Sequence, residues 1–231
     1  MLPRVILHNG VSLDGRVDGY QGGIGQFYQV ASAFQADAML SGSDTLLVAY
    51  ASASSPDEQA EESQAESRAV PGADQAGNDS RALLVVPDSR GRIHNWPQIR
   101  REPYWRDVVV LCSEATPQDY VKGLWQMGVD TIIAGEDHVD LGAALEALNA
   151  RHGIQTVQVD SGGTLNGVLL RAGLVDEISL LISPTLAGGM SPRSIYRAPD
   201  LTSAEDIIRL RLFHLEQLED GIVWLRYEVV R

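Results

Sequence analysis

The fold of this chain is decided by one segment, Val157-Gln158-Val159-Asp160-Ser161-Gly162-Gly163-Thr164-Leu165-Asn166-Gly167-Val168-Leu169-Leu170. Its first three residues are typical of a strand, two glycines follow, and a helix is expected to begin near Thr164. Glycines in such a turn let backbone N–H groups approach an anion, and the helix N-terminus adds a positive partial charge. The residues alone leave two interpretations open: an anion-binding turn, or a plain tight turn with Thr164 as the helix N-cap.

Short apolar segments alternate with helical patterns on both sides of this turn. The residues predict strands at 4–8, 38–41, 82–86, 107–112, 131–134, 155–159 and 177–182. They predict helices at 25–35 and 139–151, and a third that starts at Thr116-Pro117 with Thr116 as N-cap and Pro117 in the first helical position. Residues 207–216 and 222–230 alternate apolar and polar side chains, which predicts a β-hairpin. The expected fold is α/β, with a mostly parallel central sheet flanked by helices and an antiparallel C-terminal hairpin.

Composition and charge exclude several classes of protein. The chain has 231 residues, 44% of them hydrophobic, which suits a single domain with its own core. A net charge of −13 argues against nucleic acid as a partner, because phosphate binding needs a basic surface. No apolar stretch approaches about 18 residues, so no membrane-spanning segment is expected. The N-terminus lacks a signal-peptide pattern, which favours a cytoplasmic protein. The single cysteine, Cys112, is expected to be a small buried apolar residue.

One segment, residues 49–80, differs from the rest of the chain. It consists mostly of Ala, Ser, Gln, Glu, Asp, Gly and Pro, and its only sizeable apolar residues are Tyr50 and Val70. Such a segment cannot bury enough apolar surface to offset the entropy that is lost on ordering. We therefore expect a mobile acidic insert within a single domain that spans residues 1–231.

Three further segments carry small polar or charged residues where a strand is expected to end. In His8 to Gly19, Asn9 follows the strand directly, and the glycine-rich loop after it is either the rim of a pocket or an ordinary turn. The second segment is Leu40 to Thr45. In the third, Val86 to Arg92, Ser89 and two arginines form either a phosphate clamp or a solvated turn. The five histidines show no pair at metal-ligand spacing, so no metal site is expected.

Together these segments resemble the reductase domain of the riboflavin-biosynthesis deaminase/reductase family, whose fold is that of dihydrofolate reductase. Val11 to Val17 resembles the family's Ser/Thr-Leu-Asp-Gly-Arg/Lys segment, and Gly42 to Leu46 resembles its Gly-x-Gly-Thr-Val segment. The most specific match is Gly162 to Asn166, which continues through Leu169 to Glu177 and Ser183 to Gly189. The resemblance covers nearly the whole chain apart from the acidic insert.

The resemblance implies a reductase that uses NADPH and acts on a small-molecule substrate. The family's cofactor-contacting positions fall on Thr45, Ser89, Gly162, Gly163, Thr164, Leu165 and Asn166. Its substrate-facing positions fall on Asn9, Asp14 and Asp160, the last in place of the family's usual Glu. The implied reaction resembles that of 5-amino-6-(5-phosphoribosylamino)uracil reductase of riboflavin biosynthesis, in which a hydride delivered to ribose C1′ opens the ribose of a pyrimidine. No catalytic residue is assigned. The family also implies a homodimer, with the C-terminal strands as candidate interface.

Some family positions are not matched in this chain. The family arginine that faces the substrate phosphate corresponds to Ala33, and the stretch after the Gly-Thr pair reads Val48-Ala49-Tyr50. Since a phosphate dianion needs charged or N–H donors, these differences leave the substrate open. Two alternatives therefore stand beside the pyrimidine reductase. One is a dihydrofolate reductase-like enzyme or a paralogue for another small heterocycle, and the other is a non-catalytic nucleotide-binding module.

Overall fold

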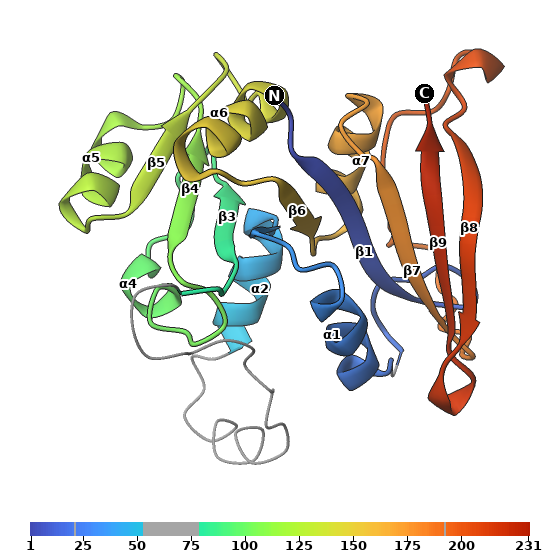
Figure 1. Ribbon diagram of the computed structural model, residues 1–231. Coiled ribbons are helices and arrows are strands. Elements are labelled where there is room, and N and C mark those ends of the chain that lie inside the picture. The colour runs from blue at the N-terminus through green and yellow to red at the C-terminus, as the bar shows by residue number, and fades with distance from the viewer. Residues whose placement is uncertain (21, 53–78, 192) are drawn as a thin grey trace. The chain divides into compact units, whose positions relative to one another are not determined.

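The computed structural model describes residues 1–20, 22–52, 79–191 and 193–231 of the chain. Within these residues the chain forms two compact units: unit 1 consists of Met1–Ala36 and Ile154–Arg231, and unit 2 of Asp37–Gly153 (Figure 1). In the part of the chain that is described, no helix has both the length and the apolar character needed to cross a bilayer. The single domain expected for residues 1–231 stays a prediction.

Unit 1 is built on strands in the order β6-β1-β7-β9-β8 (Figure 1). These strands are β1 (Arg4–Ser12), β6 (Thr156–Val159), β7 (Glu177–Ser183), β8 (Arg209–Gln217) and β9 (Val223–Val230). β1 pairs in parallel with β6 and β7, whereas β9 is antiparallel to β7 and β8. Val5, Ile6 and Leu7 of β1 are almost completely buried, as is typical of a strand between two parallel neighbours. The predicted combination of parallel strands with an antiparallel C-terminal hairpin is confirmed.

The helical elements of unit 1 are α1 (Ile24–Ser32), α7 (Gly163–Arg171) and the 3-10 turns η1 (Ala204–Asp206) and η2 (Glu219–Gly221). α1 packs beside β1 around His8, a fully buried histidine. The His8 ring stacks on Phe27, with ring centroids 4.2 Å apart, and its Nε2 lies 3.0 Å from the Phe27 carbonyl oxygen. Its Nδ1 lies 3.0 Å from Ser179 Oγ, which in turn accepts from Trp224 Nε1 at 2.8 Å. These partners suit a neutral imidazole that donates to Phe27 and accepts from Ser179.

Because His8 is neutral and buried, the stability of the fold is expected to fall in mild acid. Burial lowers the pKa of His8 from 6.5 to about 4. The unfolded chain takes up this proton below pH 6.5 while the folded chain does not, so the stabilisation is complete above pH 6.5 and is lost as the pH falls towards 4. The loss amounts to about 3 kcal/mol, since each pKa unit corresponds to about 1.4 kcal/mol. Urea denaturation at a series of pH values measures it. His8→Gln is expected to flatten the dependence of the free energy of unfolding on pH between 6.5 and 4. An unchanged slope in that variant would contradict the assignment of this pH dependence to His8.

Unit 2 is built on strands in the order β5-β4-β3-β2, and all its pairings are parallel. Its strands are β2 (Ala38–Leu40), β3 (Leu83–Pro87), β4 (Val108–Cys112) and β5 (Asp130–Ile133). All five residues of β4 are buried, and three of them, Val108, Val110 and Cys112, form one core cluster with Trp96 and Leu124. Cys112 belongs to this cluster, and burial is the main cause that raises the pKa of its thiol to about 11. The expectation of a small buried apolar residue at this position is confirmed.

The helices of unit 2 are α2 (Ser43–Ser52), α4 (Trp96–Ile99), α5 (Gln118–Gln126) and α6 (Leu141–His152). The predicted start of α5 is wrong, because the N-cap is Pro117 and no side chain caps this helix. The Thr116 hydroxyl instead accepts from the Ser113 N–H at 2.9 Å and donates to the Ser89 carbonyl at 3.0 Å. It therefore holds the loop that follows β4 to the loop that follows β3.

The boundary of the predicted insert is also wrong at its N-terminal side. Residues 49–52 belong to α2, where Tyr50 packs against the core cluster of unit 2. At the other end, the Asp79 carboxylate pairs with the Arg81 guanidinium. Residues 53–78, which carry the rest of the predicted insert, lie outside the described residues.

Candidate functional site

The glycine-rich turn joins the carboxyl end of β6 to the start of α7, as the sequence predicts. Gly162 is the N-cap of this helix, so the alternative with Thr164 as N-cap is wrong. Gly162 has an extended conformation, φ −79° and ψ 175°, and no side chain caps the helix. The first N–H groups of a helix have no partner within it, and they carry the positive end of the helix dipole. This turn is therefore chemically suited to hold an anion.

The glycines of this segment have different roles. A Cβ added to Gly162 would meet nothing within 4 Å, and the backbone conformation of Gly162 is one that any residue can adopt. A Cβ on Gly163 would lie 2.2 Å from the Ser194 carbonyl oxygen, and one on Gly167 would lie 1.9 Å from the Arg197 carbonyl oxygen. Gly163 and Gly167 therefore allow residues 194–197 to pack directly on α7, whereas Gly162 leaves open space in front of the turn.

Asn166 connects three segments of unit 1. It is fully buried, and its Nδ2 donates to the Ile195 carbonyl and to Asn9 Oδ1, each at 2.9 Å. Asn9 Nδ2 in turn donates to the Ser161 carbonyl at 2.8 Å. Residues 194–197 dock further through the Arg197 N–H, which donates to the Gly163 carbonyl at 2.9 Å. The sequence carries no signal for this docking, because residues 194–197 lie about thirty positions away from the turn.

The expectation that Asn9 follows the strand is wrong, since β1 continues to Ser12 and pairs with β7 over its whole second half. Asn9 thus lies within the sheet and is only 9% exposed. After β1, the turn interpretation is supported by Gly15 and Gly19, whose φ angles of +78° and +74° lie in the left-handed region.

Asp14 fastens this turn to the loop after β7. Its carboxylate accepts from the Ser12 hydroxyl at 2.6 Å and from the N–H groups of Ala187 and Gly188 at 3.0 and 2.7 Å. These hydrogen bonds, that from Ser12 foremost, lower the pKa of Asp14 to about 2. Asp160 is half-buried and follows β6 directly. Asn9, Asp14 and Asp160 therefore all lie at or beyond the carboxyl-terminal halves of the parallel strands of unit 1.

The other predicted cofactor residues, Thr45 and Ser89, belong to unit 2. Thr45 is exposed in the first turn of α2, and Ser89 is half-buried just after β3. Arg92 connects the two segments, because its guanidinium donates to Ser43 Oγ at 2.6 Å and forms an ion pair with Asp44 at 2.7 Å. The predicted residues thus fall into two groups, one in each unit, and within unit 2 the segments after β2 and β3 are joined.

Sequence reasoning missed Asp88, which holds the loop that carries Ser89. Asp88 is buried, and its Oδ2 accepts from the Ile93 N–H and from the Tyr120 hydroxyl, each at 2.9 Å. The Tyr120 oxygen in turn accepts from Trp96 Nε1 at 2.9 Å. Both ends of the loop between residues 88 and 93 are therefore tied to the core of unit 2. An aspartate directly after a buried strand is the signal that could have indicated this role.

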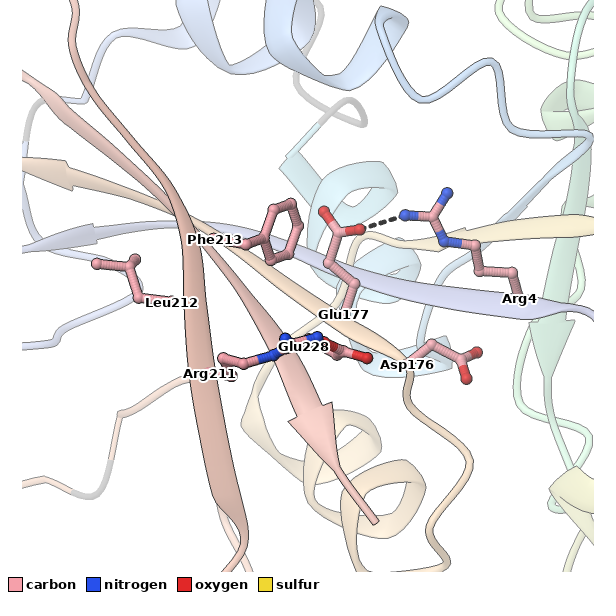
Figure 2. A pocket seen from close by; sticks show the side chains of 7 residues that line it. All are labelled: Arg4, Asp176, Glu177, Arg211, Leu212, Phe213 and Glu228. Atoms are coloured by element: carbon pink, nitrogen blue, oxygen red, sulfur yellow. Dashed lines mark hydrogen bonds and ion pairs between the residues drawn. The ribbon is translucent and has the colours of Figure 1, made fainter.

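A pocket of about 380 Å³ lies elsewhere in unit 1 (Figure 2). It is lined by Arg4, Asp176, Glu177, Arg211, Leu212, Phe213 and Glu228. Arg4 and Glu177 are the first residues of β1 and β7, so this pocket lies at the amino ends of strands whose carboxyl ends carry the candidate site. The buried Glu177 pairs with Arg4 and Arg226, and Arg211 pairs with Glu228. The remaining lining carboxylate, Asp176, pairs with Arg231, so the charged side chains of the pocket are all in ion pairs, and ligands of open α/β sheets bind at the opposite edge.

Comparison with known proteins shows what this chain is similar to over much of its length. A curated relative, the 2,5-diamino-6-ribosylamino-4(3H)-pyrimidinone 5′-phosphate reductase of Methanothermobacter thermautotrophicus, is 31% identical over 141 residues. The alignment covers 61% of this chain and 63% of that protein, so the chain matches less than two thirds of the relative's length.

Solved structures show the same fold at lower identity. The RibD protein of Acinetobacter baumannii superposes with a TM-score of 0.67 at 22% identity, over 99% of this chain and 58% of that one. A pyrimidine reductase-like protein of Corynebacterium diphtheriae gives a TM-score of 0.66 at 18% identity, over 99% of this chain and 92% of that one. The predicted dihydrofolate reductase-like α/β fold is thereby confirmed. The family model of the RibD C-terminal domain matches residues 3–224. The chain therefore belongs to the RibD C-terminal domain family.

Proposed function

We propose that this protein is an NADPH-dependent reductase that reduces a phosphoribosylaminopyrimidine, opening its ribose by delivery of a hydride to C1′. One observation carries the proposal: the turn at Gly162 presents the N-terminus of α7 with open space in front of it. The name of the Methanothermobacter relative, a ribosylamino-pyrimidinone phosphate reductase, supports this choice of substrate class. NADPH supplies the hydride, and the chain's own residues bind and orient the reactants and exclude water.

The turn fits the diphosphate of a dinucleotide cofactor. The free N–H groups of the first helical turn would donate to phosphate oxygens, and the helix dipole favours their negative charge. Thr164 is exposed in this turn, so its hydroxyl is available to the same ligand. Gly162 contributes by lacking a side chain, since any Cβ would project into the space that the phosphates need.

Considered within unit 2 alone, the loop after β3 is chemically suited to a phosphate monoester such as the one that distinguishes NADPH from NADH. Ser89 supplies a hydroxyl donor, and Arg90 is exposed beside it, whereas the Arg92 guanidinium is already paired with Asp44. A phosphate monoester is bound well by an arginine and a hydroxyl together. We therefore expect this protein to prefer NADPH over NADH.

An assay of cofactor oxidation by the purified protein tests the proposed function. The substrates to compare are the diamino-ribosylaminopyrimidinone phosphate, its deaminated uracil counterpart and dihydrofolate, each with NADPH and with NADH. The proposal expects turnover of at least one ribosylaminopyrimidine phosphate and a preference for NADPH. Reduction of dihydrofolate alone would favour the folate alternative. Cofactor binding without any turnover would favour a nucleotide-binding module.

We further propose that the protein is a homodimer that associates through the β8–β9 hairpin. β8 is an edge strand, and its register places Leu210, Leu212 and Leu215 opposite Val229, Tyr227 and Leu225, all on one face. These three leucines are 42%, 46% and 65% exposed. An exposed apolar face on an edge strand is typical of a surface that another chain covers. The same face of a second copy is a complementary partner.

Leu215→Glu is expected to convert the dimer into a monomer without loss of folding. The side chain is mostly exposed within one chain, so a charge there costs little in the monomer and is strongly unfavourable in an apolar interface. Light scattering after size-exclusion chromatography measures the mass. Trp125→Glu, at a side chain 58% exposed on α5, is the control and should stay dimeric. A wild-type protein that is monomeric at micromolar concentration would refute the dimer.

A further inference from the structure

The side chain of Asn9 uses both ends of its amide to hold other parts of unit 1. Its Nδ2 donates to the Ser161 carbonyl at 2.8 Å, and its Oδ1 accepts from Asn166 Nδ2 at 2.9 Å. Only 9% of the residue is exposed, and Asn166 is fully buried. Buried amides of this kind are costly unless they are hydrogen-bonded, and both polar atoms of Asn9 are paired here, whereas Asn166 Oδ1 has no partner among the described residues.

The hydrogen bond to Ser161 has a geometric consequence for the next N–H group. The Ser161 carbonyl and the Gly162 N–H belong to the same peptide unit, which is planar and trans, so the two groups point in opposite directions. By holding the carbonyl towards β1, Asn9 directs the Gly162 N–H away from β1. Asn166 reinforces this orientation, because the same Nδ2 that contacts Asn9 also lies 3.4 Å from the Ser161 carbonyl.

Asn166 extends the connection to residues 194–197. Its Nδ2 donates to the Ile195 carbonyl at 2.9 Å, and the missing side chains of Gly163 and Gly167 allow this segment to lie against α7. β1, the turn and residues 194–197 are thus held by two buried asparagines. A change at Asn9 is therefore expected to be transmitted to the turn through these hydrogen bonds.

We propose that Asn9 is a positioning residue for the cofactor-binding turn and not a ligand of the substrate. The inference rests on the proposed function, since it takes the turn at Gly162 as the diphosphate site. It differs from the family resemblance, which places Asn9 among the substrate-facing residues. Asn9 sets the direction of the peptide between Ser161 and Gly162, and the strength of cofactor binding follows from that direction.

The test separates cofactor affinity from substrate affinity. Asn9→Asp keeps the shape of the side chain and an acceptor for Asn166, but it places a carboxylate oxygen against the Ser161 carbonyl where an N–H donor stood. We expect the dissociation constant for NADPH, measured without substrate, to rise about tenfold, as expected for the loss of one well-made hydrogen bond. The KM for the pyrimidine substrate at saturating NADPH is expected to stay within about twofold of the wild-type value.

Ser179→Ala is the matched control, because Ser179 is a buried polar residue of β7 whose hydrogen bonds to His8 and Trp224 do not reach the turn. It is expected to lower the melting temperature and leave the dissociation constant for NADPH unchanged. A raised substrate KM in Asn9→Asp with unchanged NADPH affinity would overturn the proposal and make Asn9 a substrate ligand.

A second measurement judges the proposal without any ligand. Hydrogen exchange of the backbone amides from 161 to 167 is expected to be faster in Asn9→Asp than in the wild type and in Ser179→Ala. Equal exchange in all three proteins would overturn the positioning role. If the wild type fails to bind NADPH, the proposed function is refuted. The exchange measurement still decides in that case whether Asn9 holds the turn.

Discussion

Gly162→Val is expected to weaken NADPH binding by about 100-fold or more while leaving the free energy of unfolding nearly unchanged. A Cβ at this position meets nothing within 4 Å, and the backbone conformation of Gly162 is one that valine readily adopts. The branched side chain would therefore fill the space in front of the helix N-terminus. Loss of two charge-assisted hydrogen bonds of about 1.5 kcal/mol each corresponds to roughly 100-fold in affinity.

Fluorescence titration with NADPH measures this effect, and urea denaturation measures stability in parallel. Gly162→Ala forms a graded series with the valine variant, because its single methyl group fills less of the same space, and its loss of affinity should be smaller. Wild-type affinity in Gly162→Val would mean that the turn is purely structural and that the cofactor binds elsewhere.

In contrast to Gly162→Val, Gly167→Ala is expected to have a large effect on folding. Alanine in a helix usually stabilises by about 1 kcal/mol relative to glycine. Here the new Cβ would lie 1.9 Å from the Arg197 carbonyl oxygen, a distance that no real contact allows. The segment at 194–197 must move away, and overpacking of this kind costs about 1–3 kcal/mol. We therefore expect a net loss of stability.

Two measurements check this expectation, because the chain can respond either by losing global stability or by releasing the segment at 194–197. Urea denaturation reports a global loss of stability, and limited trypsin digestion reports release of the segment through faster cleavage after Arg193 and Arg197. Gly123→Ala in α5 is the control, since its Cβ would meet nothing within 4 Å, and it should be slightly stabilising. Unchanged stability together with unchanged cleavage in Gly167→Ala would contradict the close packing of this segment on α7.

Much of the fold could be predicted because buried parallel strands have a strong local pattern. Runs such as Val108 to Cys112 are continuously apolar, which is typical of strands that are buried on both faces. The strand ends were predicted less well, because they are set by pairing with distant residues. β1 continues to Ser12 only because β7 pairs with it up to Ser183, which no residue near Asn9 indicates.

Within the candidate site, the glycine turn itself could be predicted, but the contacts that support it could not. The glycine pair at 162–163 indicates the turn, but the sequence alone does not distinguish the roles of the two glycines. The structure separates them, because Gly163 faces the backbone of Ser194 and Gly162 faces open space. The start of α2 was also missed, since Ser43, Asp44 and Thr45 look like a loop until Arg92 and the core beneath Tyr50 hold them in a helix.

The central claim is that this chain passes a hydride from NADPH to the ribose of a pyrimidine substrate, and isotope transfer tests it most directly. The protein is supplied with NADPH that carries deuterium at the transferred position of the nicotinamide, together with the ribosylaminopyrimidine phosphate. The product is then examined by mass spectrometry and NMR. We expect a ribityl product with one deuterium at C1′. Absence of the ribityl product, or a product without deuterium at C1′, would contradict the claim.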